Sequence, residues 1–145
     1  MPVRFQLVID CAGPDRLARF WAAALGYELA PAPAGFATWN DFYRELGVAE
    51  EDLVDGADRI SDPEGHGPGI WFHPVTDAKA VKNRLHLDIR AGGEWTDPIE
   101  TRRRRVDAEA GRLALGATTT GALSDEGNFY AVGMKDPEGN EFDIN

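Results

Sequence analysis

Two histidines and one aspartate have side chains and positions that could support chemistry. His73 and His86 each lie in a short segment of β-strand character, and Asp143 lies in the last such segment of the chain. Two imidazoles and a carboxylate have the composition of a non-haem iron triad, and they also suit Mn(II), Ni(II) or Zn(II). A histidine on a half-buried strand is more often a hydrogen-bonded structural residue, so residue type alone leaves both interpretations open.

Two amphipathic helices are predicted on either side of the middle of the chain. The first covers 14–25, because Pro14 suits an opening turn, apolar residues follow at helical spacing and Gly26 suits a left-handed C-cap. The second covers 98–115 and ends in the same Ala-Leu-Gly triplet. The repetition indicates that the chain contains two copies of one structural unit.

Strands of alternating pattern repeat in the same order around the two helices. Alignment of the apolar faces of the strands before each helix places Gln6 on His86. An Asp-Pro-Glu-Gly turn and a last strand follow each helix, and matching Phe72 with Phe142 sets His73 on Asp143 if the first copy carries four extra residues. The strands are predicted over 4–10, 69–75, 84–90, 117–123, 128–135 and 141–144.

The repeated order predicts an α+β fold of two tandem βαβββ modules. They would form a cup-shaped mixed sheet with the helices on the outside. We expect one domain over residues 1–145, with module one at about 1–76 and module two at about 82–145. Module one carries an acidic insert at about 39–60.

Three segments carry a resemblance to a known superfamily. FWAAALGYE after the first strand, KNRLHLDI in mid-chain and DPEGNEFDI at the end resemble the glyoxalase-like branch of the glyoxalase/bleomycin-resistance/dioxygenase group, also called the vicinal-oxygen-chelate superfamily. In its metal-using members, four ligands come from the first and last strands of the two modules. The resemblance therefore implies a divalent metal (Fe, Mn, Ni or Zn) on Gln6, His73, His86 and Asp143, with His73 and Asp143 as catalytic residues.

The resemblance implies a small-molecule enzyme without fixing its reaction. Glyoxalase I has glutamate where His73 and Asp143 stand, which argues against that activity. The expected chemistry is that of a metal-dependent isomerase, lyase or dioxygenase acting on an oxygenated substrate. The alternatives are a metal-free protein that sequesters a ligand, as bleomycin-resistance proteins do, and a module that has lost its site.

The insert suggests how a small-molecule ligand would be bound. Its aromatic residues fit a short helix near 40–46 capped by Asn40, and residues 41–64 hold nine acids against two arginines, a net charge of −7. We interpret the acids as a solvated face and favour a lid over the cup for the aromatics, against the alternative that they only plug the core. The expected substrate-binding residues are Trp39, Phe42, Tyr43, Trp71, Asp88 and Arg90.

Charge and composition indicate which kinds of partner and which cellular compartment to expect. The net charge of −10 argues against nucleic acid, and the one basic run, 102–105, fits a solvated helix face. The N-terminal segment lacks the apolar core of a signal peptide and no uncharged stretch could span a bilayer, so we expect a soluble, cytoplasmic protein. The lone Cys11 fits a reducing compartment. Superfamily members often dimerise, which makes a homodimer a further expectation from the resemblance.

Overall fold

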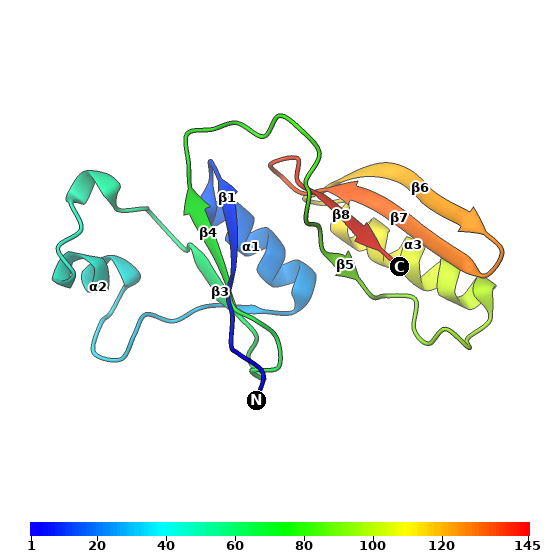
Figure 1. Cartoon of the computed structure of the whole chain (residues 1–145), viewed down its shortest axis with the longest axis horizontal. Helices are drawn as coiled ribbons and strands as arrows, with labels where there is room; N and C mark the ends of the chain where they lie inside the picture. The colour runs from blue at the N-terminus through cyan, green and yellow to red at the C-terminus, as the bar shows by residue number, and fades with distance from the viewer. The chain divides into compact units, whose positions relative to one another are not determined.

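The computed structural model describes residues 1–145, apart from the side chain of residue 122, and consists of two compact units. Unit 1 covers Met1–Ala78 and unit 2 covers Lys79–Asn145 (Figure 1). Each unit contains a four-stranded mixed sheet and a helix that packs on it. The predicted α+β fold with two βαβββ arrangements is therefore confirmed.

In unit 1 the sheet order is β1-β4-β3-β2, with β1 parallel to β4 and the other pairs antiparallel. The strands and the sheet-packing helix are β1 (Leu7–Cys11), α1 (Pro14–Leu25), β2 (Glu28–Leu29), β3 (Arg59–Ser61) and β4 (Ile70–Pro74). The insert between β2 and β3 contains α2 (Trp39–Glu45) and the short 3-10 helix η1 (Glu50–Asp52). The insert thus belongs to the same unit as the strands that it separates.

Helix α1 forms where the sequence predicts it and buries its apolar stripe. Pro14 occupies the first turn, and Gly26 ends the helix with a φ of 69°, a conformation that costs glycine little. Leu17 and Trp21 are buried on the side that packs against β3 and β4, where Phe72 is also fully buried. This helix-facing side is the core of unit 1.

Unit 2 repeats the arrangement, with the sheet order β5-β8-β7-β6. Its elements are β5 (Asp88–Ile89), α3 (Ile99–Leu113), β6 (Thr118–Glu126), β7 (Phe129–Lys135) and β8 (Glu141–Ile144). Helix α3 packs on β7 and β8, and Val106 and Leu113 of the helix are buried, as are Met134 and Phe142 of the strands. As in unit 1, the first strand is parallel to the last one.

Both first strands are shorter than the alternation predicts. The first begins at Leu7 instead of residue 4, and the second covers only Asp88 and Ile89, so Leu85 is 87% exposed instead of facing the helix. In unit 2 the paired residues of the first strand are Asp88 and Ile89, opposite Asp143 and Ile144 of β8. Apolar alternation shows which face a side chain takes, but it does not show where strand pairing begins.

The insert helix begins one residue earlier than expected and has a different cap. Thr38, not Asn40, is the N-cap, because its hydroxyl accepts from the backbone N–H of Asp41 while the Asp41 carboxylate accepts from the N–H of Thr38. Asn40 instead donates through its side chain to the carbonyl of Val54, at 3.1 Å. Within the described part of the chain, no helix has the length and apolar character needed to cross a membrane.

Burial on α1 yields a stability prediction with a matched control. Leu17 is fully buried, whereas Leu46, just after α2, is 63% exposed. We expect Leu17→Ala to lower the free energy of unfolding by about 2–5 kcal/mol and Leu46→Ala by less than about 1 kcal/mol. Urea denaturation followed by circular dichroism measures both values, and equal losses would contradict the packing of α1.

Candidate functional site

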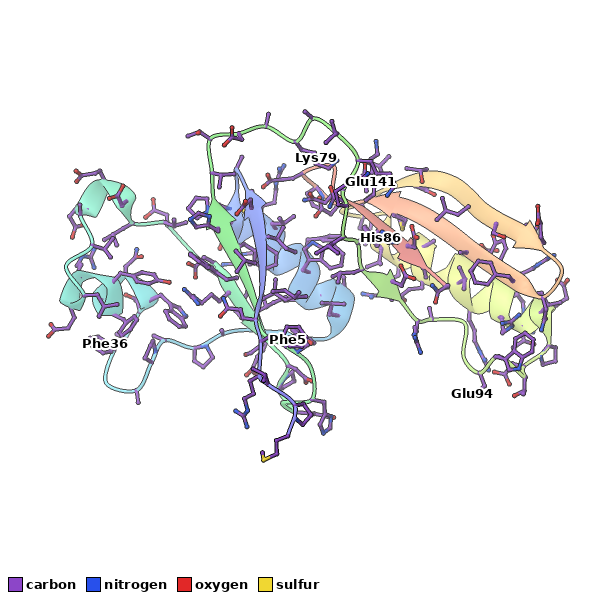
Figure 2. The ribbon with its side chains drawn as sticks, in the orientation of Figure 1. Phe5, Phe36, Lys79, His86, Glu94 and Glu141 are labelled. Carbon is purple, nitrogen blue, oxygen red and sulfur yellow. The ribbon has the colours of Figure 1, made fainter. Side chains whose placement is uncertain are left out.

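Unit 2 brings one histidine and two aspartates together at the junction of β5 and β8. The Nε2 atom of His86 lies 3.2 Å from Oδ2 of Asp143 and 3.3 Å from Oδ1 of Asp88. One donor atom from each of the three side chains lies within 4.8 Å of the other two. The structure therefore brings together two of the predicted ligands, His86 and Asp143 (His86 is labelled in Figure 2).

Strand pairing accounts for this cluster. Asp88 and Asp143 are register partners in the parallel β5–β8 pair, so their side chains leave the sheet on the same face. The backbone N–H of Asp143 donates to the carbonyl of Leu87 at 2.9 Å, which fixes the residue directly after His86. Asp88, expected to bind substrate, lies in direct contact with His86.

The second oxygen of the Asp88 carboxylate has its own partner. The side-chain amide of Asn145 donates to Oδ2 of Asp88 at 3.2 Å, while Oδ1 faces His86. The backbone carbonyl of Asn145 accepts from the N–H groups of Ala91 and Gly92, at 2.7 and 2.9 Å. These hydrogen bonds hold Asp88 in one orientation, as outer-sphere residues do at metal sites.

The donor set fits a first-row divalent cation. Donors that share an ion at about 2.0–2.2 Å lie about 3.0–3.5 Å from one another, which matches both distances from His86. The three side chains are partly exposed, at 37% for His86, 48% for Asp88 and 23% for Asp143. The cluster is thus accessible enough to exchange an ion and already arranged close to a chelating geometry.

The turn before β8 is held by charged and polar side chains. The Asp136 carboxylate accepts from the backbone N–H groups of Glu138 and Asn140, which closes the second Asp-Pro-Glu-Gly turn. Glu141 follows and accepts from the backbone N–H of Asn83 and the ammonium of Lys79 (Figure 2). These two contacts lower the pKa of Glu141 to about 2. The start of β8, two residues before Asp143, is therefore anchored to the segment that leads to His86.

In unit 1 His73 has a carboxylate partner that the sequence analysis did not identify. Nδ1 of His73 lies 3.2 Å from Oδ1 of Asp10, its register partner on β1, and the imidazole lies 4.7 Å from the ring of Trp71. Gln6 is exposed and directly precedes β1. The alternation of β1 alone could have indicated Asp10, since it places Asp10 on the same face as Gln6.

The strand registers differ by two residues from the matching predicted from the repeat. His73 is paired with Asp10, four residues after Gln6, whereas Asp143 is paired with Asp88, two residues after the histidine predicted to match Gln6. The match of Gln6 with His86 and the match of His73 with Asp143 therefore cannot both be correct. A shift of two residues keeps each side chain on its face, so alternation alone cannot detect it.

When β1 and β5 are aligned so that Gln6 matches His86, the residue of unit 1 that corresponds to Asp143 is not His73. Val8 corresponds to Asp88 in this alignment, and the register partner of Val8 is Trp71. Trp71, predicted as a substrate-binding residue, thus takes the place in unit 1 that a carboxylate takes in unit 2. Since Gln6 and His73 belong to unit 1 and the other two predicted ligands to unit 2, convergence of all four stays a prediction.

The aromatic residues of the insert surround an arginine of their own unit. The guanidinium of Arg59 lies 4.6 Å from the ring centroid of Trp39 and 4.8 Å from that of Trp71. Its Nη2 donates to the Tyr43 hydroxyl at 2.8 Å, and Asp58 accepts from the indole of Trp71 at 3.2 Å. Arg59 therefore joins α2 to β3 and β4 by stacking and hydrogen bonds.

This arrangement changes the interpretation of the insert. The ring faces of Trp39 and Trp71, expected to bind a ligand, contact Arg59. Phe42 contacts the ring of Phe36 at 5.3 Å instead (Phe36 is labelled in Figure 2). Burial raises the pKa of the Tyr43 phenol above its ordinary value. In the sequence, Asp58 and Arg59 are only part of the charged segment 41–64. The residues next to Arg59 in the chain give no sign that its side chain will lie between two tryptophans.

Unit 2 also contains a cavity of about 750 Å³, a size typical of small-molecule sites. Its wall is shared with the cluster, because Asp88 and Asn145 both line it. Arg90, predicted as a substrate-binding residue, lies there too. Four residues of the wall were not predicted from the sequence: Trp95, Arg102, Phe129 and Tyr130. Trp95 is 70% exposed.

Comparisons with known proteins agree with the resemblance. Residues 6–145 match the profile of one family, described as the glyoxalase-like domain. No curated protein matches the chain by sequence. The profile match identifies the family of the chain and does not identify its reaction.

Solved structures of the same fold cover nearly the whole chain. A hypothetical protein from S. aureus is 13% identical with a TM-score of 0.59, covering 99% of this chain and 93% of its own. A glyoxalase/bleomycin resistance protein/dioxygenase family enzyme from Burkholderia phytofirmans is 16% identical, with a TM-score of 0.54 and coverage of 96% and 94%. A fosfomycin resistance protein, FosX, from Listeria monocytogenes, solved with Mn(II) and a dihydroxypropylphosphonic acid, is 11% identical, with a TM-score of 0.60 and coverage of 99% and 91%.

The contacts of Arg59 predict that the insert depends on it for stability. Arg59→Gln removes the cation from between the two tryptophans and leaves Asp58, which is 6% exposed, without the guanidinium beside it. We expect a loss of about 1–3 kcal/mol in the free energy of unfolding. Arg44→Gln, in the same insert but in exposed ion pairs, should leave the free energy of unfolding nearly unchanged. Urea denaturation followed by tryptophan fluorescence checks both, and equal midpoints would contradict the role of Arg59.

The first Asp-Pro-Glu-Gly turn predicts a pH effect. The backbone N–H groups of Glu64 and Gly67 donate to Asp62 and lower its pKa below the ordinary 3.8. A lowered pKa in the folded state means that the stabilisation is complete above about pH 4 and disappears as the pH falls through the folded-state value. Asp62→Asn should therefore lower the melting temperature at pH 7, and its difference from the wild type should shrink below pH 4. Glu51→Gln, an equal change of charge at an exposed residue, should show neither effect.

Proposed function

The chain belongs to the glyoxalase-like domain family, and from this premise we propose that it is a small-molecule enzyme that uses a first-row divalent metal. One observation carries the proposal: His86 and Asp143, at two of the four positions where metal-using relatives have ligands, lie 3.2 Å apart. The other two positions, Gln6 and His73, stay proposed ligands. Since His73 and Asp143 replace the glutamates of glyoxalase I, we propose an isomerase, lyase or oxygenase reaction of another kind on an oxygenated substrate.

The chain's own residues supply binding, orientation and proton transfer in this proposal. A bound metal would polarise the substrate oxygens and acidify the adjacent C–H bond. Asn145 keeps Asp88 directed towards His86, and Arg90 and Trp95 offer a cation and an aromatic face in the cavity beside the cluster. In unit 1, Asp10 accepts from Nδ1 of His73 in the tautomer that leaves the lone pair on Nε2, the one atom of this ring that would then serve as a metal ligand or as a proton acceptor.

A metal-free binding protein is the second candidate, and the cavity is the observation that favours it. Trp95 and Phe129 are large aromatic residues that stay exposed at its wall, as ligand-binding surfaces often require. Trp39 and Trp71, which were expected to bind a ligand, offer it less ring surface than expected, because Arg59 already stacks on both. The cytoplasmic location and the homodimer stay predictions.

Metal analysis of the purified protein tests the proposal. After reconstitution with Mn(II), Fe(II), Ni(II) or Zn(II), we expect about one equivalent per chain for at least one ion. His86→Ala should weaken binding of that ion at least about tenfold, because it removes the only nitrogen donor of the cluster. His66→Ala is the matched control, since His66 is exposed and lies beside Glu64 in a turn. Failure of the wild-type protein to bind any of the four ions would favour the metal-free binder.

A further inference from the structure

We infer that unit 2 alone provides a three-ligand cation site in which Asp88 is the third ligand, so that metal binding does not depend on Gln6 or His73. The inference rests on the proposed function in one respect, that the protein binds a divalent metal. The family resemblance gives Asp88 no role as a ligand, and the sequence analysis assigned it to substrate binding. The structure instead places it as close to His86 as Asp143 is, at 3.3 and 3.2 Å.

The pairing of β5 with β8 fixes the position of Asp88 beside Asp143. It is the register partner of Asp143, and hydrogen bonds on both sides fix this register, from Asp143 N–H to Leu87 and from Asn145 N–H to Ile89, each at 2.9 Å. The side chain of Asn145 holds the other carboxylate oxygen of Asp88. The oxygen that faces His86 is therefore oriented without any contribution from unit 1.

Electrostatics favour a cation at this point. Two carboxylates lie beside one imidazole in this cluster, in a chain whose net charge is −10. A divalent ion would neutralise the charge of the two carboxylates and relieve the repulsion between Asp88 and Asp143. Two oxygen donors and one nitrogen donor suit Mn(II) or Fe(II) and leave coordination positions for water and substrate oxygens.

His73 and Gln6 lie in unit 1 and have surroundings of their own. Asp10 engages Nδ1 of His73 and so orients that imidazole within unit 1, and Gln6 precedes β1 with an exposed side chain. A site made entirely by β5, β8 and the residues beside them needs only the internal geometry of unit 2.

The test measures Mn(II) binding to the full-length chain by isothermal titration calorimetry and by electron paramagnetic resonance. Asp88→Asn keeps the size of the side chain and removes its charge, and we expect the dissociation constant to rise at least about tenfold. Asp77→Asn, at an exposed position, is the charge-matched control and should change it less than about threefold. The double substitution Gln6→Ala with His73→Ala should also change it less than about threefold.

Each outcome decides the inference. If Asp88→Asn binds Mn(II) as tightly as Asp77→Asn while His86→Ala does not, Asp88 is only an ion-pair partner of His86, and the inference fails while the proposed metal function stands. A tenfold loss in the double variant would overturn the independence of unit 2. If the wild-type chain binds no Mn(II), Fe(II), Ni(II) or Zn(II), the proposed function and the inference both fail. Circular dichroism without metal checks folding, and Asp88→Ser replaces Asp88→Asn if that variant is unfolded.

Discussion

The parallel pairing of the first and last strands in each unit is the constraint on which the candidate site depends. In unit 2 this pairing brings Asp88 beside Asp143 although the whole of α3, β6 and β7 lies between them in the chain. Backbone hydrogen bonds fix the register, and the register decides which side chains share a face. A shift of β5 by one residue along β8 would turn Asp88 to the face of the sheet opposite Asp143 and would separate the two carboxylates.

The same pairing has a different chemical result in unit 1. There the partners are Asp10 and His73, and the next pair on that face is Val8 with Trp71. One unit thus carries two carboxylates and a histidine at its strand pair, and the other carries a single carboxylate–histidine pair next to an indole ring. The repeat preserved the backbone arrangement and allowed the side chains to diverge, which is why fold and chemistry have to be argued separately.

The insert shows how an internal cation can occupy an aromatic surface. Trp39 and Tyr43 were expected from the sequence to bind a small-molecule ligand. Arg59 takes that place through stacking on two indole rings and a hydrogen bond to the phenol. The buried Asp58 balances its charge and also accepts from Trp71. The insert therefore packs on the sheet of its own unit through hydrogen bonds and stacking on Arg59, and not through aliphatic side chains.

The sequence by itself determined what depends on neighbours in the chain. Helix α1 matched its prediction because capping and apolar spacing act within a few residues, and both Asp-Pro-Glu-Gly turns formed because Asp62 and Asp136 bond to the backbone directly after them. The order of strands and helices followed from the same local patterns, and the family followed from the resemblance of three short segments to its members. His86 and Asp143 could be named in advance because the resemblance fixed their positions.

Only the tertiary structure decided what depends on the relation between distant strands. Alternation repeats every two residues, so it could not show which residues of the first and last strands are paired or where β5 begins. The direct contact of Asp88 with His86, the pairing of Asp10 with His73 and the place of Arg59 between two tryptophans arise from that register and from the folding back of the insert. Such contacts join residues far apart in the chain, and the local sequence around each of them carries no record of its partner.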